Sequence, residues 1–180
     1  MSWRRRAEVI ALYASVLIAA GAATSVASAH RATAAAAPNC SAANTQIWLG
    51  LGLGGGTAGS TYYPLEFSNV GHRACTLNGF PGVSAEGNGG GQVGPSAGRN
   101  GQHHATVTLA AGATAHAILR VVDWGALCSN QVPAIALRVY APGETRAEEV
   151  PFSFGACAHQ GVLIVGPVRA GVGIPGYTTS

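Results

Sequence analysis

Short runs in which apolar and polar residues alternate are the feature that most limits what this chain can fold into. After residue 30 these runs recur between clusters of Gly, Pro and Asn, and no stretch keeps a helical apolar stripe over three turns. Alternation with a period of two places one set of side chains on one face of a strand. Many short strands separated by turns are typical of sandwiches and barrels. We therefore expect an all-β fold, an antiparallel β-sandwich of the Ig-like or jelly-roll-like kind.

The alternation also predicts which side chains face the core in each expected strand. A further strand is expected within residues 161–168, and residues 86–102 are expected to form a long exposed loop because they are rich in Gly. On the strand 61–69, Glu66 and Ser68 are expected on the polar face. The expected core-facing residues are Ile47, Leu49, Leu51 and Leu53; Tyr63, Leu65 and Phe67; Val107 and Leu109; Ala117, Leu119 and Val121; Ile135, Leu137 and Val139; and Val150, Phe152 and Phe154.

The first 29 residues have the pattern of a secretory signal. A basic stretch, residues 3–6, precedes the apolar run 9–26, and Ala27-Ser28-Ala29 is the small-x-small pattern of a cleavage site. We predict a signal helix with cleavage between Ala29 and His30. The alternative is an uncleaved membrane anchor, since the apolar run approaches the ~20 residues that span a bilayer. The expected division is a signal peptide at 1–29, an Ala-rich linker at 30–39, the β-sandwich at 40–168 and a flexible tail at 169–180.

Charge excludes several classes of function. The formal net charge of the chain is +3. Removing the leader removes three arginines and Glu8, which leaves seven arginines against six carboxylates. A chain so nearly neutral has no basic stripe to neutralise phosphates, so nucleic acid is not an expected partner. The sequence also has no lysine, which excludes a P-loop and Schiff-base chemistry.

The four cysteines all follow the predicted cleavage site: Cys40, Cys75, Cys128 and Cys157. An even number in an exported chain predicts two disulfides, for which three pairings are possible. We favour Cys40–Cys75 with Cys128–Cys157, because each bond then joins neighbouring segments. Loops of roughly 30–35 residues would each contribute up to about 3.5–4 kcal/mol. A zinc site is the alternative, but no Cys-x-x-Cys pair is present.

The stretch "EFSNVGHRACTLNGFPGV", residues 66–83, predicts a disulfide-linked corner. Asn69-Val70-Gly71 supplies turn residues that tolerate a positive φ, so the strand 61–69 can reverse towards Cys75. Pro81 cannot donate to a ladder, and Gly82 accepts a turn conformation that is closed to other residues. We expect the strand to end at Phe-Pro-Gly and this corner to be structural.

The same stretch resembles the hallmark of a family of secreted actinobacterial proteins, domain of unknown function 4232. The resemblance covers roughly residues 40–168, and the segment "LAAGATA" and the two later cysteines also resemble the family pattern. The family has no assigned activity, so the resemblance implies a secreted domain but assigns no functional residue. The positions that match the hallmark are Leu65, Asn69, Gly71, Cys75, Leu77, Gly79, Phe80, Pro81 and Val83.

Two glycine motifs look catalytic but lack the required context. Gly94 to Gly98 fits the Gly-x-Ser-x-Gly nucleophile elbow around Ser96, yet neither a buried strand nor a helix is predicted beside it. Residues 54–59 fit Gly-x-Gly-x-x-Gly, yet a β-prone segment follows where a dinucleotide fold needs a helix. A serine hydrolase would have to combine Ser96, a histidine and Asp123, the only aspartate. We expect Ser96 to be a loop residue and Asp123 to cap a turn.

Histidines raise the possibility of a metal site, which we do not favour. His103 and His104 are adjacent and would point to opposite faces of a strand, so they cannot easily share one ion. We expect His116 to face solvent. We predict no metal and no cofactor, with scattered surface histidines. The six histidines are His30, His72, His103, His104, His116 and His159.

Two tryptophans are the best candidates for a binding surface. Trp48 lies on the strand face opposite Ile47 and Leu49, so it is exposed if those two residues form the core. Trp124 follows Asp123 in a turn segment. Both are weak candidates, because packing against the flank of a sheet is the commoner role of such residues.

The sequence as a whole therefore predicts a non-enzymatic, secreted or cell-envelope module with a binding or structural role. The expected partner is an envelope polymer, a protein or a small ligand, contacted through loops at one end of the sandwich. Membrane contact is expected only through the leader, if it is uncleaved. The alternatives are a small secreted serine hydrolase and a metal-binding extracytoplasmic protein.

Overall fold

Two stacked β-sheets and a small third sheet make up the part of the chain that can be described. The computed structural model describes residues 36–51 and 56–173. The sheets are antiparallel with few exceptions, and two disulfides join the cysteines, so the expected fold class is confirmed. The predicted signal helix and the cleavage site at Ala29 and His30 lie outside the described residues.

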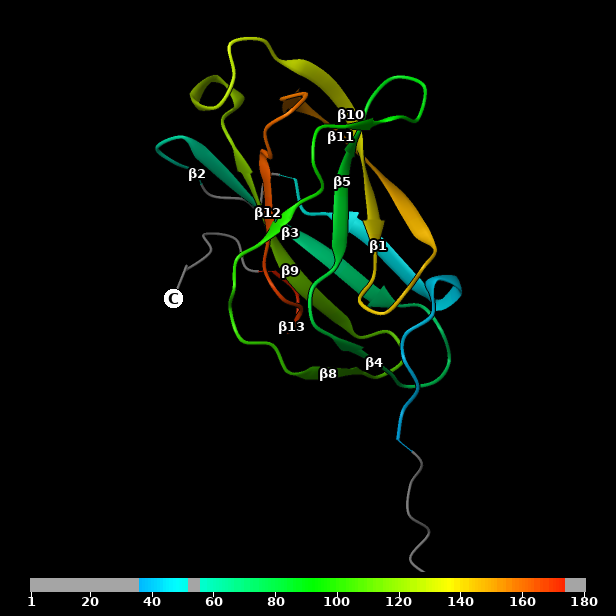
Figure 1. The fold of residues 1–180 in the computed structure, drawn as a ribbon. Coiled ribbons are helices and arrows are strands. Elements are labelled where there is room, and N and C mark those ends of the chain that lie inside the picture. Colours follow the sequence, from blue (N-terminus) through cyan, green and yellow to red (C-terminus); the bar gives the residue numbers. More distant parts are fainter. Residues whose placement is uncertain (1–35, 52–55, 174–180) are drawn as a thin grey trace, which may run out of the picture. The chain divides into compact units, whose positions relative to one another are not determined.

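The larger sheet is built around two long central strands, β3 and β9, which pair in register over nine residues each. The other strands flank this pair, and β12 and β7 form a parallel pairing at one edge (Figure 1). The strand order is β1 (Thr45–Leu49), β3 (Ser60–Asn69), β9 (Thr114–Val122), β12 (Leu163–Val165) and β7 (Gly98–Arg99), with β2 (Gly56–Thr57) on β3 and β13 (Arg169–Ala170) on β9.

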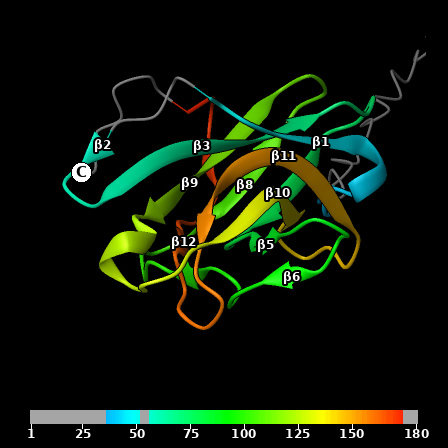
Figure 2. The ribbon, with the colours of Figure 1, turned by 90° about the horizontal axis from the view of Figure 1, so that it is seen from above.

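The second sheet has four strands, and a two-stranded sheet lies beside it in the fold. Seen from above, β1 and β3 lie on one side and β5 and β6 on the other (Figure 2). Two short 3₁₀ helices, η1 (Ala42–Asn44) and η2 (Trp124–Ala126), complete the described part. The second sheet has the order β11 (Ala147–Ala156), β10 (Val132–Tyr140), β5 (Gly82–Glu86) and β6 (Gln92–Val93), and the small sheet pairs β4 (Cys75–Asn78) with β8 (Thr106–Leu109).

A single apolar cluster fills the space between the sheets. Leu65 and Phe67 of β3 and Leu119 of β9 are fully buried, as are Leu137 and Val139 of β10. These are alternate residues on their strands, so the expected alternation correctly places them in the core.

Among the described residues, two that were predicted for the core are exposed instead; Leu53 lies outside the described residues. Leu51 is 61% exposed because β1 ends at Leu49, and alternation has no meaning beyond the end of a strand. Ile135 is 41% exposed because the register of β10 on β11 shifts between Ala134 and Ala136. An irregularity of this kind changes which residues face inwards, so Ala134 and Ala136 are buried in place of Ile135.

The corner after β3 is held by one buried amide. Asn69 is 1% exposed, and its Nδ2 donates to the carbonyls of Arg73 (2.9 Å), Leu109 (3.1 Å) and Ala110 (3.1 Å). Its Oδ1 accepts from the amide of Gly71 (3.0 Å). The side chain therefore joins the turn to the end of β8, a role that local turn propensity does not reveal.

The glycines of this corner differ from the expectation. Gly71 and Gly82 do not have a positive φ, whereas Gly79 does, at 98°. Gly71 has little free space beside it, since a Cβ there would lie 3.1 Å from the Cβ of Asn44 and 3.2 Å from Asn69 Oδ1. Gly82 begins β5 rather than a turn. At Gly71 the corner is thus a close approach of the backbone to the side chains of Asn44 and Asn69 and not a left-handed turn.

Two disulfides connect the cysteines in the pairing favoured from the sequence. Cys40 bonds to Cys75, with the Cα atoms 4.8 Å apart, and joins the segment before η1 to β4. Cys128 bonds to Cys157 with a Cα separation of 6.1 Å and joins the turn after η2 to the end of β11. The two bonds therefore hold different parts of the fold.

The segment expected to be one long exposed loop, residues 86–102, is only partly so. It contains β6 and β7, and it begins with Glu86 at the end of β5, which is 5% exposed. Glu86 Oε1 accepts from the guanidinium of Arg138 at 2.7 Å, across the β5–β10 pair. The strand β5 was missed because its residues, "GVSAE", show no clear alternation of apolar and polar types.

The paired region extends beyond the limits expected for the domain, 40–168. Asn39 makes an isolated bridge to Thr76, and β13 places residues 169–170 on β9. Gly173 is buried. Within the described residues, no helix is long and apolar enough to cross a membrane; the apolar run 9–26 is outside this part.

Candidate functional site

The end of the sandwich where β3 begins and β9 ends is hollow. A cavity of about 400 Å³ lies there, within the range of small-molecule sites. It is lined by the β2–β3 turn, the end of β9, η2 and the second half of β11. We call it the aromatic cavity; its lining residues include Tyr63, Trp124, Phe152 and Phe154.

Three aromatic rings form a continuous cluster at the aromatic cavity. Tyr63 of β3 meets Phe152 of β11 edge to face, with ring centroids 4.9 Å apart. Phe152 stacks on Phe154 with centroids 5.0 Å apart, since residues two apart share a strand face. Phe152 is 8% exposed, whereas Tyr63 and Phe154 are half-buried and so contribute the accessible part of this wall.

Trp124 is held in place by the backbone of η2. The amide of Asp123 donates to the Gly59 carbonyl, and Asp123 Oδ1 accepts from the amide of Gly125 (3.1 Å), capping the turn. The Trp124 carbonyl accepts from the amides of the next turn, which leads directly into the Cys128–Cys157 disulfide. The backbone that carries the indole is therefore held by its own hydrogen bonds and by the disulfide.

Gly155 makes room for the indole. A Cβ at this position would lie 2.6 Å from Trp124 Nε1 and would also overlap the side chain of Gln131. Gly155 does not have a positive φ, so space alone selects glycine at this point of β11. The ring of Trp124 lies against bare backbone, which is a common reason for glycine within a strand.

The polar part of the aromatic cavity is made of hydroxyls and one carboxylate. Ser60, Thr61 and Ser153 line it beside Asp123, and no lysine, arginine or histidine of the described residues does so. Ser60 Oγ donates to the Gly59 carbonyl and accepts from Arg120 Nε at 2.9 Å. The cavity therefore offers aromatic faces and hydrogen-bond acceptors, with no cation to bind an anionic group.

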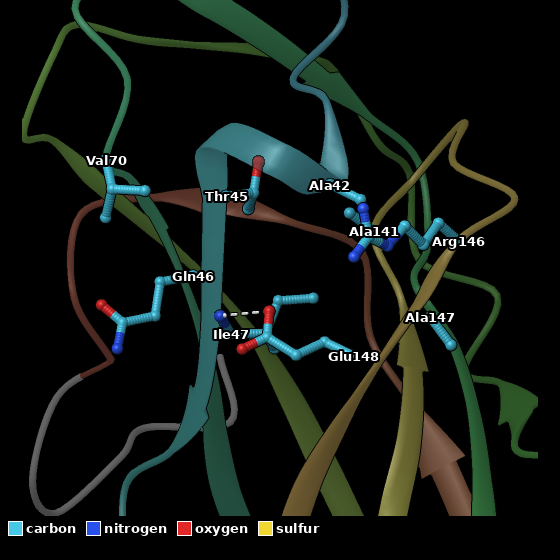
Figure 3. A pocket seen from close by; sticks show the side chains of 9 residues that line it. All are labelled: Ala42, Thr45, Gln46, Ile47, Val70, Ala141, Arg146, Ala147 and Glu148. Atoms are coloured by element: carbon cyan, nitrogen blue, oxygen red, sulfur yellow. Dashed lines mark hydrogen bonds between the residues drawn. The ribbon is translucent and has the colours of Figure 1, made fainter.

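A second hollow, of about 380 Å³, lies between β1 and the β10–β11 hairpin (Figure 3). Glu148 reaches across it, and its Oε2 accepts from the backbone amide of Ile47 at 3.0 Å. This contact occupies an edge amide of β1 that another strand could otherwise use. Arg146 lies on the opposite side of the hollow from Gln46 and Val70. None of the residues that line this second hollow is aromatic, and the side chain of Glu148 extends into it.

The two tryptophans proposed from the sequence have different surroundings. Trp48 is 39% exposed on the outer face of β1, as its phase on the strand predicts, and its Nε1 donates to Ser68 Oγ at 3.4 Å. It lines neither hollow. Trp124 lines the aromatic cavity. Gly56 and Gly59, the described glycines of the Gly-rich segment, lie beside Trp124 in that lining rather than beside Trp48.

The residues required by a hydrolase have other contacts. Ser96 is exposed, and its Oγ accepts from Gln92 Nε2 at 3.3 Å. The elbow motif lies between β6 and β7, so no helix follows the serine. Asp123 caps η2, as expected for a turn residue. The other glycine motif likewise leads into β2 and β3 and not into a helix.

The described histidines are dispersed over the fold. His72, His103 and His159 are exposed, and the ring of His104 meets Phe80 edge to face at 5.8 Å. His116 is half-buried rather than open to solvent, because residues after β13 cover it. Among the residues of known placement, no three His, Cys, Asp or Glu side chains are grouped as metal ligands would be.

The sequence does not predict that these aromatic residues line one cavity. Phe152 and Phe154 were assigned to the core from their alternation, and nothing local shows that β11 leaves one of them at a hollow end. The available signal was the small residue Gly155 directly after an aromatic pair, which indicates a nearby bulky group. That signal is weak without knowledge of the neighbouring strands.

Comparison with known protein families shows to which family the chain belongs. Residues 40–169 match the family described as Domain of unknown function (DUF4232). The chain belongs to this family. No curated protein and no solved structure shows a significant match. In this DUF4232 protein the matched residues include both disulfides, the Asn69 corner and the aromatic cavity.

Proposed function

We propose that this DUF4232 protein is a secreted or envelope-retained, non-catalytic binding module whose ligand occupies the aromatic cavity. The observation that carries the proposal is Trp124, which lines a cavity of about 400 Å³ together with two half-buried aromatic rings. Concave, largely preformed aromatic sites with a few polar groups are the usual form of small-ligand sites.

The chemistry of the aromatic cavity favours a neutral, polyhydroxylated ligand, such as a sugar unit of an envelope polymer. The C–H faces of a sugar ring pack on aromatic rings, whose π faces carry partial negative charge. Hydroxyls can donate to Asp123 and exchange hydrogen bonds with Ser153 and Thr61, which all line the cavity. A strongly anionic ligand would meet a carboxylate and no cation of the described lining.

The extracytoplasmic part of the proposal is supported by the cysteines. Two disulfides, with no free cysteine among the described residues, are typical of proteins that fold in an oxidising compartment. The proposed secretion adds the signal pattern of residues 1–29. Intact mass spectrometry of the exported protein tests it, with an expected mass that begins at His30 and is about four daltons below that of the reduced chain. A mass that includes the leader would contradict cleavage.

Binding is tested by comparing the two tryptophans. Defined neutral oligosaccharides would be screened on an array and then titrated by calorimetry against the wild type, Trp124→Ala and Trp48→Ala. We expect Trp124→Ala to weaken binding at least about tenfold, the equivalent of 1.4 kcal/mol, and Trp48→Ala to leave it unchanged. Loss of binding in Trp48→Ala alone would place the site on the outer face of β1 instead.

The hydrolase alternative is separable by labelling. A fluorophosphonate probe reacts with an activated serine, and we expect no labelling that depends on Ser96, because its hydroxyl bonds to a Gln92 amide rather than to an imidazole. Labelling of the wild type that disappears in Ser96→Ala would overturn the non-catalytic proposal. Labelling that persists in Ser96→Ala would be nonspecific.

A further inference from the structure

The outer face of the larger sheet carries a carboxyl group that is buried where the sequence predicts an exposed one. Glu66 lies in register with Trp48 on β1 and with His116 on β9. Its alternation with Leu65 and Phe67 places it on the solvent side of β3. Yet Glu66 is 0% exposed. Something other than the core must therefore cover it.

The covering group is the segment 169–173, which we call the C-terminal strap. It begins as β13, where Arg169 pairs with His116 in register. It then crosses the outer face of β9 and reaches β3, since the Gly171 carbonyl is 2.8 Å from His116 Nδ1 and the Gly173 amide donates to Glu66 Oε1 at 2.6 Å. A carbonyl oxygen only accepts, so His116 Nδ1 must carry a proton in this contact.

The contact at Gly173 is close enough to exclude any other residue. A Cβ there would lie 2.9 Å from Glu66 Oε1 and would overlap the ring of Pro64. Gly173 and Pro64 are both buried. The strap therefore lies directly on the sheet with no room for water between its end and β3.

Glu66 lacks the partners that a buried carboxylate needs. Its Oε2 has no hydrogen-bond partner among the described residues. Glu86, which also has one unpartnered oxygen, differs because Arg138 forms a salt bridge with it at 2.7 Å. A buried carboxylate without a cation is costly, and such a group binds a proton instead.

The charged and titratable neighbours of Glu66 are few. From β9 the facing group is His116, and from the strap it is the uncharged backbone of Gly173. From β1 the facing residue is Trp48, which carries no charge. Arg169 of β13 pairs with His116, and its guanidinium donates a hydrogen bond to the His103 carbonyl. Arg120, further along β9, donates to Ser60.

Burial raises the pKa of Glu66 above its ordinary value, and the hydrogen bond from Gly173 and the charge of His116 oppose this only in part. A carboxyl with a raised pKa in the closed state holds its proton more tightly there than when it is exposed. Its contribution to closure is therefore fully present at low pH, declines once the pH exceeds the exposed value and is lost as the pH passes the raised one.

We propose that Glu66, His116 and the C-terminal strap form a proton-sensitive latch on the outer face of the larger sheet. With Glu66 neutral, the strap lies closed over Pro64, Glu66 and His116. Ionisation of Glu66 opens the strap and exposes this strip of β3 and β9 beside the already exposed Trp48. The latch is separate from the aromatic cavity, whose lining contains none of these residues.

Hydrogen exchange of the strap tests the latch directly. Amide protection of residues 169–173 would be measured by mass spectrometry between about pH 4.5 and pH 8, after correction for the intrinsic pH dependence of exchange. We expect the opening equilibrium of the wild type to increase by about tenfold for each unit by which the Glu66 pKa is raised. In Glu66→Gln, which keeps the shape and cannot ionise, protection should stay high and independent of pH.

Matched variants identify the responsible group. Glu149→Gln removes an exposed carboxyl from β11 and should leave the pH dependence of the wild type. Gly173→Ala should leave the strap open at every pH, because the added Cβ overlaps Pro64. Protection of the wild-type strap that does not change with pH would overturn the proposal, as would an unchanged pH dependence in Glu66→Gln.

A second measurement does not depend on any variant. The side-chain carboxyl of Glu66 would be followed by carbon NMR through the same titration. The proposal requires its pKa to lie above that of an exposed glutamate and strap protection to fall over the same pH interval. A Glu66 that titrates like an exposed carboxyl, or strap protection that falls at a different pH, would contradict the latch.

Discussion

The two ends of β3 differ in how they are packed: one is filled by a buried side chain and the other lines a cavity. At one end the buried side chain of Asn69 donates to three carbonyls and accepts from one amide, which holds the corner beside Cys40–Cys75 together. Towards the other end of β3, Tyr63 and Trp124 line a cavity, and η2 leads from it to the Cys128–Cys157 disulfide. A disulfide lies near each end, but the aromatic cavity is at the end that Tyr63 and Trp124 line. The difference indicates that the corner serves stability and that the hollow end is available for a ligand.

Removal of the disulfides should have the largest effect and should show how the two ends differ. Each loop, of 35 and 29 residues, contributes roughly 3.5–4 kcal/mol in the chain-entropy model. Cys40→Ser with Cys75→Ser should cost more than the second pair, because both of these cysteines are buried, whereas Cys128 is half-buried. Urea denaturation of each double variant measures the difference. A larger loss for the second pair would contradict the assignment of stability to the corner.

Asn69→Ala should be the next most destabilising change. It removes the side-chain donor of three carbonyls, one of which, that of Ala110, still accepts from the Ala113 amide. We expect a cost of about 3 kcal/mol, since each unsatisfied buried group costs about 1–3 kcal/mol and partial rehydration offsets some of this. Asn78→Ala is the matched control, because Asn78 is exposed and bonds only to the Thr106 hydroxyl. Equal denaturation midpoints for the two variants would show that the corner is not held by Asn69.

Gly155→Ala should affect the hollow end specifically. The added methyl group overlaps the Trp124 indole, which we expect to cost about 1–3 kcal/mol and to shift the indole fluorescence. Gly161→Ala is the control, since a Cβ at Gly161 has nothing within 4 Å. An unchanged Trp124 emission in Gly155→Ala, with Trp48 replaced by Phe to isolate the signal, would show that the indole is not fixed.

Ile135→Thr should have the smallest effect, within about 0.5 kcal/mol, as for most exposed positions. The register shift between Ala134 and Ala136 turns Ile135 outwards near the hollow end. Leu137→Thr, two residues along the same strand, should cost several times more, because Leu137 is fully buried. Comparable losses in thermal unfolding would mean that β10 runs without the shift.

The position of the corner could be predicted from the sequence, but the hydrogen bonds that hold it could not. The Cys75 pattern and the Phe-Pro-Gly stop marked where β4 ends, because proline and glycine act on the local backbone. The role of Asn69 depends on Leu109 and Ala110, about 40 residues away, which no local pattern connects to it. The positive φ expected near Gly71 is found at Gly79 instead.

The hollow end could be predicted less well. Trp124 and the turn cap at Asp123 were candidates from residue type alone, and the structure places both at the aromatic cavity. Tyr63 and Phe152 were placed in the core, where alternation puts them, yet the meeting of their rings depends on how the two sheets stack. The Ser96 motif shows the reverse case, in which a pattern matches but the surrounding strands do not supply its context.

The sequence by itself determined the class of fold, because alternation and turn residues act on the nearest neighbours of each position. It predicted two disulfides but left three pairings possible, and the structure shows which of them forms. Tertiary structure alone decided that Glu66 is buried and that one end of the sandwich is hollow. Both depend on segments far apart in the chain, Gly173 over β3 and β11 against η2. The alternation pattern of a strand predicts which face of the sheet a side chain is on. Whether that side chain is buried depends also on which distant segment covers that face.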